Sequence, residues 1–212
     1  EFSTPLDADA VRARYGLRTD VPVVLISAGA SGGPRTLQVV RQSMPLTTPF
    51  QAVVVCGRNA ELKAQIEEMV ADDNRFTVLG FTDEMPALMR IASLFVGKPG
   101  GLSSSECMAA GLPMMIVDPI PGQETRNSDY LLEAGAAVRC NYATTVGYKL
   151  GQLLADPQRL AAMAEAARRI GHPDAAATVA AMATALDLPL LGISRDAQKL
   201  IQKAFSEGAE VV

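Results

Sequence analysis

Short apolar runs alternate with segments of helical periodicity along most of this chain. The runs are rich in Val, Ile and Leu, as strands covered on both faces of a sheet are. They predict strands at 23–27, 52–56, 76–79, 94–96, 114–117 and 136–138. Apolar residues recur at helical spacing between them. The predicted helices begin at Pro34, after Gly57, at Thr82 or Asp83, at Ser103 and at Gln123. Such alternation requires right-handed crossovers, so we predict a doubly wound, Rossmann-like α/β domain with a parallel sheet of about six strands.

The last third of the chain is rich in Ala and helical in pattern. Its periodicity predicts three helices at about 143–155, 157–170 and 174–186, then a loop and one more helix within 186–212. We therefore expect a folded domain over 21–185, with 1–20 as a linker and 186–212 as a C-terminal appendage.

Composition excludes several classes of function. The formal net charge of the 212 residues is −4 and no basic cluster is present, which argues against binding to a nucleic-acid backbone. No apolar run approaches the roughly 20 residues of a membrane span, and the first residues do not resemble a signal peptide; we expect a cytoplasmic protein. The chain has a single His, His172, beside Pro173, and three widely spaced cysteines. We expect no metal site, buried reduced thiols, and a helix boundary at His172.

Three loops that follow strands carry the candidate chemistry, because ligands of such sheets bind at the carboxyl ends of the strands. The first loop holds Gly29, Ser31 and Gly32. Its backbone amides could bind an anion, yet it does not match GxGxxG, and Cys56-Gly57-Arg58 lacks the acid that binds a dinucleotide ribose. A plain turn between strand and helix is the alternative.

The second loop, KPGGLSSSE from Lys98 to Glu106, again joins a strand to a helix. Amides near Leu102 and Ser103 could point towards a phosphate from the helix N-terminus. Ser103 and Glu106 also have the spacing of a capping box, so spacing alone leaves Glu106 as either a cap or a ligand contact.

The third loop is rigid, with two prolines and Gly122, and it ends in Gln123 and Glu124. These two side chains can hydrogen-bond the hydroxyls of a sugar, and they are equally ordinary residues for the first turn of a helix.

Together, the motifs KPGG…E and PGQE…N, about twenty residues apart, resemble those of the monogalactosyldiacylglycerol synthase group. Processive diacylglycerol glucosyltransferases and the peptidoglycan N-acetylglucosaminyltransferase are similar. The segment LGFTDEM at 79–85 also fits, and the resemblance covers about 1–180. It implies the C-terminal half of a GT-B fold, the half that binds a nucleotide-sugar donor, usually a UDP-sugar.

The resemblance also implies roles for individual residues. Uracil would contact Phe81, Thr82 and Met85, with Thr82 acting through its backbone. The ribose hydroxyls would contact Glu106, and Asn127 would support the loop that holds Gln123 and Glu124. The diphosphate would lie at Gly101, Leu102 and Ser103, near Gly29, Ser31 and Gly32. Gln123 and Glu124 would bind the sugar.

The reaction implied by the resemblance is inverting hexosyl transfer to a lipid, with diacylglycerol favoured. It needs no cofactor or metal. The general base, the acceptor groove and the membrane contact would belong to an N-terminal half outside this chain, so no catalytic residue is assigned here. Half of a UDP-sugar 2-epimerase and a non-catalytic nucleotide-binding module remain as alternatives.

Overall fold

Six parallel strands form one sheet in the part of the chain that the structure describes. The computed structural model describes residues 2–27, 29, 35–185 and 199. The strand order is β3-β2-β1-β4-β5-β6, and every neighbouring pair is parallel. The strands are β1 (Val23–Ser27), β2 (Gln51–Val55), β3 (Phe76–Leu79), β4 (Leu94–Gly97), β5 (Met114–Val117) and β6 (Ala137–Cys140). This topology confirms the predicted doubly wound, Rossmann-like class.

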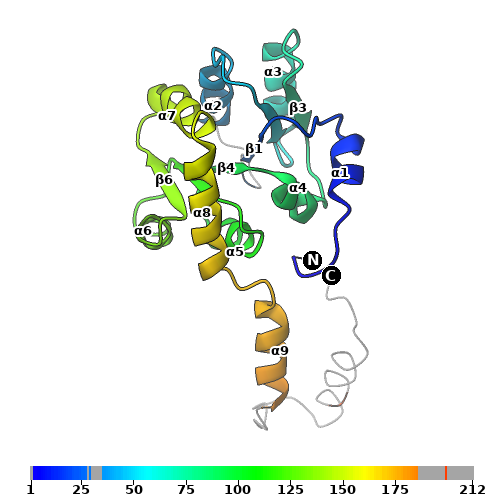
Figure 1. Cartoon of the computed structure of the whole chain (residues 1–212), viewed down its shortest axis with the longest axis vertical. Helices are drawn as coiled ribbons and strands as arrows, with labels where there is room; N and C mark the ends of the chain where they lie inside the picture. Colours follow the sequence, from blue (N-terminus) through cyan, green and yellow to red (C-terminus); the bar gives the residue numbers. More distant parts are fainter. Residues whose placement is uncertain (1, 28, 30–34, 186–198, 200–212) are drawn as a thin grey trace. The chain divides into compact units, whose positions relative to one another are not determined.

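Helices cover both faces of the sheet (Figure 1). Side chains from α2, α3 and α7 pack on one face, those from α1, α4, α5 and α6 pack on the other, and α8 contributes to both clusters. The helices of the described chain are α1 (Ala8–Arg14), α2 (Arg35–Ser43), α3 (Ala60–Met69), α4 (Met85–Ile91), α5 (Gly101–Ala109), α6 (Thr125–Glu133), α7 (Val146–Leu154), α8 (Pro157–Ile170) and α9 (Ala175–Ala185), with a 3₁₀ turn at Ala143–Thr145.

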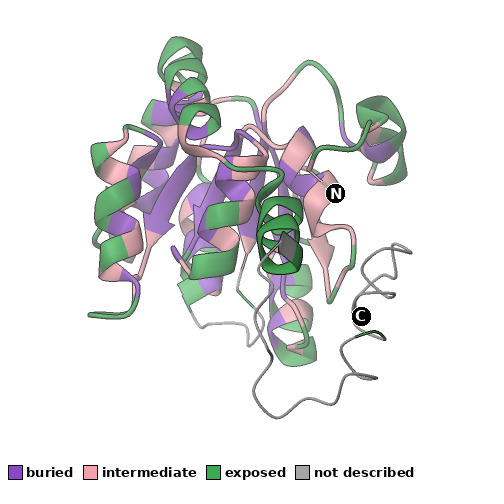
Figure 2. Ribbon diagram, turned by 90° about the horizontal axis from the view of Figure 1, so that it is seen from below, coloured by how far each residue is buried: buried purple, intermediate pink, exposed green. Residues whose placement is uncertain are grey.

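The sheet is covered on both faces, which explains why the strand sequences are continuous apolar runs. Val24 and Ile26 of β1 belong to one core cluster, whereas Val23 and Leu25 belong to the other. All four are buried, because successive side chains of a strand point to opposite faces. Figure 2 shows the buried strands between helices whose outer sides are exposed.

Three helices near the carboxyl ends of the strands begin at other residues than predicted. Helix α5 begins at Gly101, two residues before Ser103, and α6 begins at Thr125 instead of Gln123. Helix α4 begins at Met85, with Glu84 as its N-cap residue and Pro86 in its first turn. The predicted caps at Thr82 or Asp83 are therefore wrong. Pro86 suits a first turn, where its missing N–H has no helical partner.

The chain divides into two compact units, residues 1–173 and residues 174–212. In the first unit, the segment 1–20 contributes α1 and buries Val11 and Leu17 in the core. The second unit contains α9. Apart from Lys199, the segment 186–212 lies outside the described residues, and so does the helix predicted there.

The three cysteines are buried and form no disulfide, which confirms the expectation of buried thiols. Burial raises the pKa of the Cys56 thiol to about 11. Burial, together with the nearby charge of Glu106, also raises the pKa of Cys107. Both groups are therefore protonated and unreactive near neutral pH.

Candidate functional site

The three candidate loops all lie at the carboxyl edge of the sheet. Strands β1 and β4 are neighbours, although two strands separate them in sequence. This is the point where the strand order reverses, and open α/β sheets bind ligands there. The candidate residues that the structure describes therefore lie at the edge where such a sheet is expected to bind a ligand.

The loop after β1 is only partly described. Gly29 is exposed and has a φ of +71°, in the left-handed region that favours glycine. Its N–H donates to the Ser27 hydroxyl, with 3.3 Å between N and Oγ. Ser31 and Gly32, predicted to meet the diphosphate, lie outside the described residues.

The second loop leads into the N-terminus of α5. Gly100 is the N-cap residue and has no side chain to cap the helix. The first hydrogen bond within the helix runs from the Ser104 N–H to the Gly100 carbonyl, over 2.8 Å. Helix geometry leaves the N–H groups of Gly101, Leu102 and Ser103 without a helical acceptor. Leu102 is 80% exposed, so this end of the helix is open to solvent and suits an anion.

The start of α5 tests the capping-box interpretation of Glu106. A capping box needs its Glu at the third helical position, with Ser or Thr as the N-cap residue. The third helical residue here is Ser103 and the N-cap residue is Gly100. The capping-box interpretation is therefore wrong, because the helix begins before the Ser that was expected to cap it. Half-buried Glu106 lies in the second turn.

Gln123 and Glu124 have different surroundings. Gln123 is exposed, whereas Glu124 is only 8% exposed. The Ile120 N–H donates to Oε2 of Glu124 over 2.7 Å, and the Glu124 N–H donates to the Ile120 carbonyl over 2.9 Å. This pair of bonds closes the third loop. The other carboxylate oxygen, Oε1, lies 3.6 Å from the place that a Cβ on Gly100 would occupy.

Asn127, in the first turn of α6, bonds the second loop. Its Nδ2 donates to the carbonyl of buried Pro99 over 2.9 Å. The resemblance implied that Asn127 supports the loop of Gln123 and Glu124. The hydrogen bond of its side chain runs instead to the KPGG loop.

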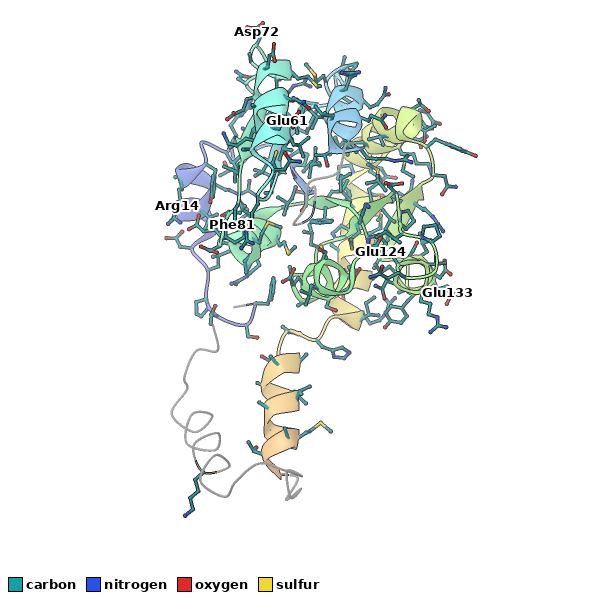
Figure 3. The ribbon with its side chains drawn as sticks, turned by 180° about the vertical axis from the view of Figure 1, so that it is seen from behind. Arg14, Glu61, Asp72, Phe81, Glu124 and Glu133 are labelled. Atoms are coloured by element: carbon teal, nitrogen blue, oxygen red, sulfur yellow. The ribbon has the colours of Figure 1, made fainter. Side chains whose placement is uncertain are left out.

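Phe81, Thr82 and Met85 lie together after β3. Phe81 is 62% exposed, and the guanidinium carbon of Arg58 lies 5.2 Å from the centre of its ring. The Thr82 hydroxyl accepts a hydrogen bond from the Glu84 N–H, over 3.1 Å. Met85 is half-buried against the core. Figure 3 shows Phe81 beside α4 and Glu124 near α5 and α6, in different parts of the first unit.

Sequence reasoning missed four charged residues of this edge. Arg58 stacks on Phe81, and Arg35 and Lys98 form ion pairs with Asp118. The places of three of these residues along the chain could have indicated them. Lys98 and Asp118 each follow a strand directly, and Arg35 begins the helix after the first loop.

A metal site, His172 and a cavity remain to be placed relative to the three loops. Among the described residues, no three His, Cys, Asp or Glu side chains are close enough to hold a metal ion. His172 is exposed beside Pro173, after the end of α8. A cavity of about 500 Å³ lies where β2 begins, lined by Phe50, Gln51 and Arg75 among others, so it is at the opposite edge from the three loops.

Residues 23–179 match the family model described as the glycosyltransferase family 28 C-terminal domain. The chain belongs to this family. A curated relative, the processive diacylglycerol beta-glucosyltransferase of Bacillus licheniformis, is 33% identical over 161 residues, which are 76% of this chain and 42% of the relative. The chain thus spans less than half the length of this relative.

Solved structures share the fold. MurG of Acinetobacter baumannii has a TM-score of 0.64 at 22% identity, over 80% of this chain and 54% of its own. The HepE protein of Anabaena, solved with UDP-glucose, has a TM-score of 0.61 at 18% identity, over 79% and 48%. A putative UDP-N-acetylglucosamine 2-epimerase of Listeria monocytogenes has a TM-score of 0.65 at 15% identity, over 88% and 49%. Because these identities are low, the likeness concerns the fold alone, which glycosyltransferases and an epimerase share.

Proposed function

We propose that this chain binds the UDP-sugar donor of an inverting glycosyltransferase that transfers a hexose to a lipid, most simply diacylglycerol. The observation that carries the proposal is the open N-terminus of α5. Asn127 bonds the loop before this helix, and Oε1 of Glu124 lies near Gly100. The name of the 33% identical relative supports diacylglycerol as the acceptor.

In this proposal each loop binds one part of the donor. Phe81 offers an exposed ring to uracil, with Thr82 and Met85 beside it. Glu106 accepts hydrogen bonds from the ribose hydroxyls. The diphosphate meets the N–H groups of Gly101, Leu102 and Ser103, and Gln123 and Glu124 bind the hydroxyls of the sugar.

The chemistry follows from this arrangement. The acceptor hydroxyl attacks the anomeric carbon, the bond from that carbon to the diphosphate breaks, and the diphosphate leaves with the electron pair. Negative charge then grows on the leaving group, where fixed N–H groups of α5 stabilise it. We assign no metal or cofactor to this step. The general base and the membrane contact belong, in this proposal, to a part of the enzyme outside this chain.

Titration calorimetry with UDP tests the proposal. We expect the wild-type chain to bind UDP, and Glu106→Ala to weaken binding by about tenfold, the loss expected for hydrogen bonds to a charged group. The ribose role adds a sharper readout, since Glu106→Ala should change the affinity for 2′-deoxy-UDP much less. Glu133→Ala is the matched control, because it removes an exposed carboxylate from the end of α6.

Several outcomes would contradict parts of this proposal. No heat from the wild-type chain would overturn UDP binding, and equal affinity in Glu106→Ala would overturn the ribose contact. Glucosyl transfer by the chain alone would overturn its dependence on another part. Conversion of UDP-N-acetylglucosamine to its 2-epimer would favour the epimerase alternative.

A further inference from the structure

A cluster of three charged side chains lies at the switch point of the sheet. Nε of Arg35 lies 3.1 Å from Oδ1 of Asp118, and Nζ of Lys98 lies 3.9 Å from Oδ2 of the same carboxylate. Arg35 begins α2, Lys98 follows β4 and Asp118 follows β5. In the sheet β4 lies between β1 and β5, so side chains from the start of α2 and from the segments after β4 and β5 meet here.

The cluster has an excess of positive charge and remains accessible. Two cations share one carboxylate, so the sum of charges is 2 − 1 = +1. The side chains of Arg35, Lys98 and Asp118 are 48%, 44% and 31% exposed. Exposed ion pairs contribute little to stability, so a structural role explains the cluster poorly.

The backbone of Asp118 adds an independent observation. Its φ is +49°, and it is the one non-glycine residue with a positive φ among the described residues. Such conformations disfavour side chains with a Cβ and gather at functional sites. The carboxylate of this residue pairs with two cations from other segments, the start of α2 and the loop after β4.

We propose that Arg35 and Lys98 bind the diphosphate of the sugar donor, and that Asp118 is an internal anion that holds both cations until the diphosphate displaces it. This inference rests on the proposed function. Phosphate oxygens suit the guanidinium and ammonium groups as carboxylate oxygens do. A nucleoside diphosphate carries more negative charge than one carboxylate, so it gains more from both cations.

The surroundings of Lys98 favour the same ligand. Lys98 lies on the loop that ends in the open N–H groups of α5, three residues further along the chain. Pro99, directly after Lys98, is fixed by the hydrogen bond from Asn127. A diphosphate at the N-terminus of α5 would therefore have Lys98 on one side of it, with Arg35 held nearby through Asp118.

The test compares UDP with uridine, which has the same base and ribose without phosphates. NMR titration at low ionic strength measures both affinities. We expect Arg35→Gln and Lys98→Gln each to weaken UDP binding by about tenfold, with the affinity for uridine unchanged. Arg41→Gln is the matched control, because Arg41 is an exposed arginine in the last turn of the same helix, α2; it should leave both affinities unchanged.

Asp118→Asn tests the displacement. Asn tolerates a positive φ as well as Asp does, so the backbone conformation is retained while the charge is removed. We expect UDP to bind about threefold more tightly, as the loss of an exposed ion pair permits, with the gain disappearing at high salt. Weaker UDP binding in this variant would overturn the displacement.

The outcomes separate this inference from the proposed function. If the wild-type chain binds UDP and both Gln variants bind UDP with the wild-type affinity, the inference is overturned and the proposed function stands. If the wild-type chain binds neither UDP nor uridine, the proposed function is overturned and the inference falls with it.

Discussion

The side-chain amide of Asn127 donates a hydrogen bond to the Pro99 carbonyl, with 2.9 Å between Nδ2 and O. The two residues are 28 apart in sequence, on α6 and on the loop before α5. The bond therefore joins the two motifs, PGQE…N and KPGG…E, that carried the family resemblance. It explains physically why an Asn belongs to the first motif: its side chain holds the backbone of the second.

We expect Asn127→Asp to weaken UDP binding while the fold is kept. A carboxylate cannot donate to the Pro99 carbonyl and would be repelled by its oxygen, so the loop before α5 loses its hydrogen bond to α6. Loss of one such bond costs about 1 kcal/mol of stability, measurable by urea unfolding, and calorimetry would report the UDP affinity. Asn141→Asp, at an exposed position, is the control. UDP affinity equal to wild type in Asn127→Asp would contradict the role.

Two glycines of α7 should respond differently to alanine. A Cβ on Gly147 would lie 2.3 Å from the backbone carbonyl oxygen of Gln42, which cannot move without shifting the end of α2. A Cβ on Gly151 would lie 3.0 Å from Cδ2 of Leu46, a side-chain atom that can turn away. We expect Gly147→Ala to lower the free energy of unfolding by about 2 kcal/mol or more.

Gly151→Ala is the matched control for this pair. It lies one turn along the same helix and gains the helix propensity of Ala, about 1 kcal/mol, against a small packing cost. Thermal and urea unfolding would measure both variants. Equal stability of the two would contradict the close approach of α7 to the Gln42 backbone.

Asp73 should support stability at neutral pH and lose this effect in acid. Its carboxylate accepts hydrogen bonds from Arg75, at 2.8 and 2.6 Å, and this contact lowers the pKa of Asp73. The folded pKa then lies below the unfolded value of about 3.9. The stabilisation is therefore complete above pH 4 and is lost as pH falls through the folded pKa.

Asp73→Asn should therefore be less stable than wild type at pH 7, by about 1 kcal/mol, and the difference should shrink below about pH 4. Arg75 also donates to the carbonyls of Met44 and Leu46, at 2.6 and 2.7 Å, so Asp73 orients a side chain that holds the loop after α2. Asp72→Asn, at the neighbouring exposed position (Figure 3), is the control. A constant difference between Asp73→Asn and wild type at every pH would contradict the ion pair.

Cys56 and Cys107 should resist thiol reagents in the folded protein. Burial raises the pKa of both thiols, that of Cys56 to about 11. At pH 8 we expect neither to be labelled by an aromatic disulfide reagent until urea unfolds the chain. Mass spectrometry of the labelled peptides would locate the modification. Rapid labelling of either residue in the native protein would contradict the packing.

Periodicity alone determined the strands and their class. Runs of buried β-branched residues such as Val23–Ser27 predict a strand of a parallel sheet, because such a strand is covered on both faces and is apolar on both. Helix starts were harder to predict. Ser103 and Glu106 have the spacing of a cap, yet α5 begins at Gly101, which follows a glycine N-cap residue.

At the carboxyl edge of the sheet, too, some residues could be predicted from the sequence and others could not. Motif positions in the sequence were enough to single out Glu106, Gln123, Glu124 and Asn127. Only the tertiary structure showed that Asp118 joins Arg35 to Lys98 and that Arg58 lies over Phe81. Local sequence governs which elements form, through side-chain burial and turns. Contacts between charged groups depend on strand order, which brings the carboxyl ends of β1, β4 and β5 together although β4 and β5 begin 71 and 91 residues after the start of β1.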